Sequence, residues 1–174
     1  HMSNHLSFLI YHYALIFPKE YQPKNITIGG LLIKDGQKIS KSKGNGIPLI
    51  QIREMYGADL YRLYVAVAAS FDAEMDFRDD EITQLNKRFS KWKDYMYDAK
   101  LVKPINIDSC TDIDTWLVSQ FYTRAKVYFS AMDEFKFRDA YVSVLYEFLN
   151  DISYHERRSS KEKTLAVIRY IFTD

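Results

Sequence analysis

A short polar segment at residues 38–46 combines the residue types that bind phosphate groups. Lysine ammonium groups act as point charges for phosphate oxygens, hydroxyl groups add donors, and glycines let the backbone close around a ligand. Like charges this close repel by up to ~1 kcal/mol per pair in water, so the segment should stay mobile until an anion binds. A solvated surface loop is the alternative interpretation. The residues are Lys38, Ser40, Lys41, Ser42, Lys43, Gly44 and Gly46.

A β-hairpin is predicted to present this segment. Residues 26–33 are short and rich in β-branched side chains, and the Asp35-Gly36 pair follows them, which is typical of a strand that runs into a tight turn. The return strand is predicted at residues 37–39. The polar segment then leaves the open end of the hairpin, where a ligand can reach it.

Helical periodicity dominates the rest of the chain, so the predicted fold class is α+β, mostly α. Pro48 suits the first turn of a helix and Gly57 suits the end of one. Trp92 and Trp116 lie on apolar helix faces, which favours core packing over base stacking. The predicted helices cover residues 3–17, 49–56, 58–69, 79–101, 112–133, 137–157 and 161–174, with a connector at 72–77 and a loop at 103–111.

Composition restricts the classes of function. Lys and Arg total 24 against 23 Asp and Glu in 174 residues, so the net charge of +1 gives no general attraction to nucleic acid. The single Cys110 excludes an intrachain disulfide, and no apolar run is long enough for a membrane span. We therefore expect a cytoplasmic chain without a membrane partner. No His or Cys pattern has the spacing of a metal site, so none is predicted.

Two local basic clusters could still contact the phosphates of a nucleic acid. Acidic residues interleave with both clusters, so a solvated helix face is the alternative. One cluster lies on the long predicted helix and the other lies where two helices meet. They consist of Lys87, Arg88 and Lys91, and of Arg157 and Arg158.

The run from Lys38 to Asn45 resembles the Lys-Met-Ser-Lys-Ser signature loop of class I aminoacyl-tRNA synthetases. Ile39 stands where that family usually has Met, a swap that conserves volume. Upstream, residues 28–37 resemble the hairpin that presents the loop, and downstream residues 56–64 resemble the Gly-Ala-Asp-x-x-Arg helix start of the family.

Further runs resemble the archaeal and eukaryotic-cytosolic type of leucyl-tRNA synthetase. Isoleucyl, valyl and methionyl enzymes stay open as alternatives, as does a non-catalytic helical interaction module. The runs that carry the resemblance are residues 4–8, 16–18 and 75–78, and residues 114–117, 137–140, 150–151 and 157–158 within what resembles an anticodon-binding domain.

The resemblance implies a chemical role for the loop. It would close over ATP, bound with Mg²⁺, while the carboxylate of leucine attacks the α-phosphorus, and the leucyl group would then pass to tRNA(Leu). Lys41 would be the main catalytic contact, assisted by Lys38 and Ser40, and these three would bind ATP together with Ser42. The tRNA phosphates would meet the two basic clusters.

The resemblance also implies an organisation. Residues 1–2 are interpreted as a cloning scar, 3–48 as the end of a Rossmann-like catalytic domain, 49–78 as a connecting stem-contact module and 79–174 as a truncated anticodon-binding bundle. No His-x-Gly-His motif occurs, so we expect an inactive fragment with no tightly bound cofactor. Self-association through exposed helix faces stays open.

Overall fold

The computed structural model describes residues 2–26, 28–46, 48–70 and 73–173, and for residues 2, 3 and 41 it describes the backbone alone. His1 of the interpreted cloning scar, Asp72 of the predicted connector and the last residue of the predicted final helix lie outside the described residues. Helices dominate, and three short strands form the one sheet of the described part, so the α+β, mostly α prediction is confirmed.

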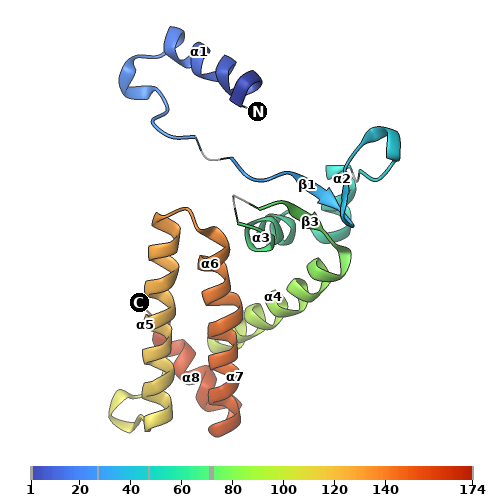
Figure 1. The fold of residues 1–174 in the computed structure, drawn as a ribbon. Coiled ribbons are helices and arrows are strands. Elements are labelled where there is room, and N and C mark those ends of the chain that lie inside the picture. The colour runs from blue at the N-terminus through green and yellow to red at the C-terminus, as the bar shows by residue number, and fades with distance from the viewer. Residues whose placement is uncertain (1, 27, 47, 71–72, 174) are drawn as a thin grey trace.

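The helices follow the predicted order closely. The first runs through a π-helical turn, η1, into α1, and it ends before Pro18, where the ring would block its continuation. No residue of α1 is buried, and Figure 1 shows it apart from the other helices, joined to the sheet by an extended segment. The bounds are η1 (Met2–Leu6), α1 (Ser7–Ile16), η2 (Lys19–Tyr21), η3 (Lys41–Lys43), α2 (Leu49–Tyr56), α3 (Ala58–Ala68), α4 (Asp79–Ala99), η4 (Ile107–Ser109), α5 (Asp112–Asp133), α6 (Phe137–Val142), η5 (Ser143–Phe148), α7 (Leu149–Arg158) and α8 (Lys161–Ile171).

The sheet differs from the predicted hairpin. Its strands are β1 (Leu32–Lys34), β2 (Gln37–Lys38) and β3 (Met75–Phe77), in the order β2-β1-β3. β1 pairs antiparallel with β2 and parallel with β3, where Leu32 lies opposite Met75. The prediction of a strand from residue 26 was wrong at its start, because residues 28–31 include two glycines, which weaken a strand. The predicted connector was also incomplete, since it contains β3.

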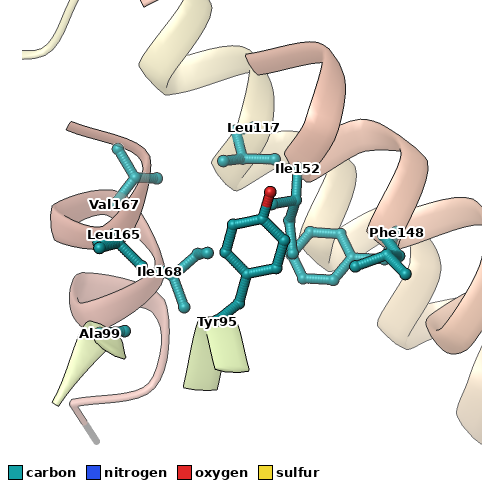
Figure 2. Packing of buried hydrophobic residues seen from close by; sticks show 9 residues of the cluster. Tyr95, Ala99, Leu117, Phe148, Ile152, Leu165, Val167 and Ile168 are labelled. Carbon is teal, nitrogen blue, oxygen red and sulfur yellow. The ribbon is translucent and has the colours of Figure 1, made fainter. Parts of the chain in front are cut away.

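Two buried clusters form the core. One joins α3, β3, the start of α4 and η5 through Leu60, Tyr64, Val67, Met75, Phe77, Ile82, Leu85 and Leu145. The other, shown in Figure 2, joins the end of α4 to α5, the end of η5, α7 and α8 through Tyr95, Ala99, Leu117, Phe148, Leu149, Ile152, Leu165, Val167 and Ile168.

The long helix α4 belongs to both clusters, so it connects the sheet to the helical bundle, as Figure 1 shows. Trp92 packs against both clusters and Trp116 against the bundle cluster, as predicted for core residues. The predicted helix at 137–157 contains a π-helical section, η5, between α6 and α7. Among the described residues, no helix combines the length and the apolar character that a membrane span requires.

Candidate functional site

The turn between β1 and β2 fixes where the polar loop starts. Asp35 and Gly36 both have positive φ angles, 51° and 72°. Two successive residues of this kind form the type I′ turn, whose twist matches that of the paired strands. β2 then ends at Lys38, and the loop begins at the open end of the hairpin, as the sequence predicts.

Local hydrogen bonds shape the loop. It contains the 3₁₀ turn η3, in which the Lys43 N–H donates to the Ser40 carbonyl oxygen at 3.1 Å. The Ser40 and Ser42 hydroxyl oxygens lie 2.7 Å apart within hydrogen-bonding distance. Gly44 then adopts a φ of 63°, which turns the chain back toward β2.

Asn45 closes this loop, and the sequence analysis did not single it out. Its side-chain oxygen accepts the Ser40 N–H at 2.9 Å, and its side-chain nitrogen donates to the Lys38 carbonyl oxygen at 3.1 Å. Asn and Asp side chains often bond to nearby backbone in this way, especially beside glycine. The asparagine next to a glycine in the sequence therefore could have predicted that Asn45 bonds to the loop backbone.

The structure places the predicted ATP-binding residues on one short segment. The side chain of Lys38 is exposed and that of Ser40 is half-buried, while Ser42 is exposed. The side chain of Lys41 lies outside the described part of the chain. The ammonium groups of Lys38 and Lys43 form no ion pair with a described carboxylate, so both are available to an anion.

The carboxylate of Asp76, on β3, bonds to the turn of the hairpin. Both of its carboxylate oxygens accept the Gly36 N–H at 3.1 Å, and the Arg78 Nε donates to one of them at 3.0 Å. The Gly36 N–H has the largest effect and lowers the pKa of Asp76; burial raises it, and Arg78 lowers it further, so the pKa lies below its ordinary value. The hairpin is thus attached to the strand that leads into α4.

The two predicted basic clusters lie on α4 and α7. The Lys91 Nζ donates to the Ser153 hydroxyl at 3.0 Å, one helical turn before Arg157. Lys87 and Arg157 are exposed and form no ion pair with a described acid. Arg88 packs over the ring of Tyr146, and Arg158 lies 3.5 Å from the centre of the Tyr154 ring. We refer to these five basic residues as the α4–α7 basic seam.

A buried polar network elsewhere in the bundle was not predicted. The His155 Nε2 lies 2.9 Å from an Asp114 oxygen, and its Nδ1 lies 2.8 Å from the Thr164 hydroxyl. The Lys163 Nζ lies 2.9 Å from the other Asp114 oxygen. Asp114, His155 and Thr164 are fully buried, so no substrate reaches them and the network is structural.

Burial raises the pKa of the Asp114 carboxyl, but the donors around it outweigh that effect. Lys163, the Thr111 hydroxyl and N–H, and His155 together lower the pKa below its ordinary range. The described residues contain no group of three or more His, Cys, Asp or Glu side chains arranged for a metal ion.

The chain resembles known proteins over most of its length. Residues 7–91 match the family described as "tRNA synthetases class I (M)". Over 170 residues, the chain is 41% identical to a leucine–tRNA ligase of Thermoplasma volcanium, and this match covers 97% of the chain. The chain therefore matches a part of leucine–tRNA ligases over nearly its whole length. A leucine–tRNA ligase of Staphylothermus marinus is 37% identical over 173 residues and 99% of the chain.

The match covers only a part of these ligases. The chain spans 18% of the length of each of these two relatives. A solved structure of a LeuRS from Agrobacterium radiobacter, in a ternary complex with tRNA and LeuAMS, resembles the chain with a TM-score of 0.63 over 82% of it. Its sequence identity to the chain is 18%, and the chain covers 20% of that protein, so this likeness concerns the fold alone.

Proposed function

We propose that this chain is the part of a leucine–tRNA ligase that closes over ATP and carries part of the tRNA surface. The observation that carries the proposal is the hydrogen-bonded loop at 38–45, which leaves the open end of a hairpin. Lys38 and Lys43 on this loop are exposed and form no ion pair with a described carboxylate. The residue pattern of the loop and its position after a tight turn fit a site for a polyphosphate.

The chemistry follows from where charge develops. A carboxylate oxygen of leucine attacks the α-phosphorus of ATP, the bond from that phosphorus to the bridging oxygen breaks, and pyrophosphate leaves. Negative charge grows on the leaving oxygens, and a positioned ammonium group stabilises it most in the transition state. We assign this role to Lys41, with Lys38 and Ser40 beside it and Ser42 as a further ATP contact.

Mg²⁺ enters the proposal as a companion of ATP. It would neutralise phosphate charge, and the loop would supply ammonium and hydroxyl groups to the remaining oxygens. In this role Mg²⁺ is bound by the phosphates of ATP, and we assign it no ligand on this chain. The activity would belong in the cytoplasm, where the substrates of protein synthesis occur.

The α4–α7 basic seam is the proposed contact for tRNA(Leu). Lys87 and Arg157, which form no ion pair with a described acid, offer positive charge to phosphates, while Arg88 and Arg158 also contact aromatic rings. Contacts of this kind position an RNA without reading its bases. We therefore expect the seam to contribute to the binding of tRNA and not to the recognition of its sequence.

The isolated chain is also proposed to associate with itself through exposed apolar helix faces. On α1, Leu15 and Ile16 are 82% and 65% exposed, and on α5 Tyr122 and Phe129 are 66% and 65% exposed. Apolar faces of this kind favour association in water. Sedimentation of the purified chain at several concentrations tests this, and a monomer throughout would contradict it.

Amino-acid specificity separates this proposal from its competitors. The complete enzyme is assayed for ATP–pyrophosphate exchange with leucine, isoleucine, valine and methionine. We expect leucine to stimulate exchange at least ~100-fold more than each of the others, the scale on which a pocket separates similar side chains. Preferential stimulation by another amino acid would assign the chain to that synthetase, and no stimulation would favour a non-catalytic interaction module.

A further inference from the structure

The side chain of Asn45 spans the mouth of the signature loop. It accepts the Ser40 N–H at 2.9 Å and donates to the Lys38 carbonyl at 3.1 Å, so both polar atoms of the carboxamide are used. One end must accept and the other must donate. Among side chains of this length, only a carboxamide satisfies both backbone groups.

The rest of the loop is shaped so that Asn45 can reach back. The bond from the Lys43 N–H to the Ser40 carbonyl tightens η3, and the left-handed Gly44 reverses the chain. Gly46 lies against Ile39, where an added Cβ would stand 3.4 Å from the Ile39 Cγ2. Hydrogen bonds therefore close the loop from residue 38 to residue 45, with Lys38 and Lys43 exposed on it.

We infer that Asn45 is a positioning residue that holds the backbone of Lys38 and Ser40 in place before ATP binds. The inference rests on the proposed function. Three ammonium groups within six residues repel one another, so a loop without this closure would have to be ordered by the nucleotide itself. A loop that is already ordered stabilises the developing charge without that cost.

The location of Asn45 distinguishes this role from direct contact. Its side chain is half-buried and bonds to backbone alone among its described contacts. It therefore acts through Lys38 and Ser40. A residue of this kind should affect the rate of the chemical step more than the binding of ATP.

The test compares Asn45→Ala with Asn45→Asp in the complete enzyme. Asn45→Ala loses both bonds, and we expect kcat for leucine-dependent ATP–pyrophosphate exchange to fall about 10- to 100-fold with little change in the KM for ATP. Asn45→Asp keeps an acceptor for the Ser40 N–H and loses the donor to Lys38, so its loss should be smaller. Asn106→Ala is the matched control, because Asn106 caps the 3₁₀ turn η4 far along the chain through a similar bond to the Asp108 N–H at 3.1 Å.

Hydrogen exchange gives a readout that does not depend on activity. Asn45→Ala should speed exchange of the Ser40 amide, Asn45→Asp should keep that amide protected, and the paired amides of β1 should be unchanged in both. Unchanged exchange at Ser40 in Asn45→Ala, or an unchanged kcat in that variant, would overturn the inference. If Lys41→Ala lowers activity and Asn45→Ala does not, only this inference fails; if neither does, the proposed function fails as well.

Discussion

The carboxylate of Asp114 is fully buried within the helical bundle. Its two carboxylate oxygens are shared among His155, Lys163 and Thr111, which belong to or adjoin three different helices. Thr111 is also the N-cap residue of α5, and it forms a capping box with Asp114. One carboxylate thus fixes the start of α5 against the end of α7 and the start of α8.

Replacing Asp114 by Asn should lower the free energy of unfolding by about 3 kcal/mol at neutral pH, because it removes one member of a buried charged network. The control is Asp112→Asn, an exposed carboxylate in the first turn of the same helix, which should cost well under ~1 kcal/mol. Urea unfolding of both variants measures the difference. Equal stability of the two would show that the network contributes nothing.

The pH dependence of stability follows from the same residue. Because the folded state lowers the pKa of Asp114, the stabilisation is complete above its ordinary value of 3.8 and is lost as the pH falls below that value. Urea unfolding between pH 5 and pH 3 should therefore show a decline that is shallower in Asp114→Asn. An identical decline in both proteins would contradict this assignment.

At the scale of elements, helix ends could be read from the sequence and tertiary strand pairing could not. Pro48 is the residue just before α2, and Gly57, with a φ of 79°, is the residue just after it. Both positions agree with the preferences of proline and glycine at helix ends. β3 has three residues, and it pairs with β1 through partners far apart along the chain, such as Leu32 and Met75, which no local pattern encodes.

The same limit applies to the candidate site. The lysines and serines of the loop could be predicted because several phosphate-binding residue types lie close together in the sequence. The bonding partners of Asn45 and Asp76 could not, because only the folded loop and sheet bring those backbone groups near. The network around His155 joins residues far apart along the chain, with Asp114 and His155 separated by 41 positions, so spacing along the chain did not suggest it.

The close approach of two backbone segments at Gly30 gives a prediction at this scale. A Cβ on Gly30 would stand 1.9 Å from the Ala73 carbonyl oxygen, next to the bond between the Met75 N–H and the Leu31 carbonyl at 2.9 Å. Gly30→Ala should therefore force β1 and β3 apart and lower stability by about 1–3 kcal/mol. Gly29→Ala is the matched control, since its Cβ would meet nothing within 4 Å. Thermal unfolding that ranks the two variants equally would contradict the contact.

At the scale of the whole molecule, α4 links the loop to the bundle. It contributes to both buried clusters, and Asp76 attaches the hairpin to the strand just before it. The α4 part of the basic seam, Lys87, Arg88 and Lys91, therefore lies on the same helix that follows the sheet.

The seam gives a salt-dependence prediction. Binding of tRNA(Leu) to the complete enzyme should weaken linearly on a plot of log affinity against log salt, and Arg157→Ala should make the slope less steep by about one. Lys126→Ala, an exposed lysine on α5 outside the seam, should leave the slope unchanged. The same slope in Arg157→Ala and in the unaltered enzyme would remove Arg157 from the interface.

The most direct test of the account measures leucine-dependent ATP–pyrophosphate exchange by the complete enzyme carrying Lys41→Ala, with Lys103→Ala, an exposed lysine in the loop between α4 and α5, as the control. The account predicts a fall of about 100- to 1,000-fold for Lys41→Ala, the usual effect of removing one donor that stabilises transition-state charge. Binding of leucine should be unchanged. Exchange by Lys41→Ala at the rate of the control would contradict the proposal that this loop acts on the phosphates of ATP.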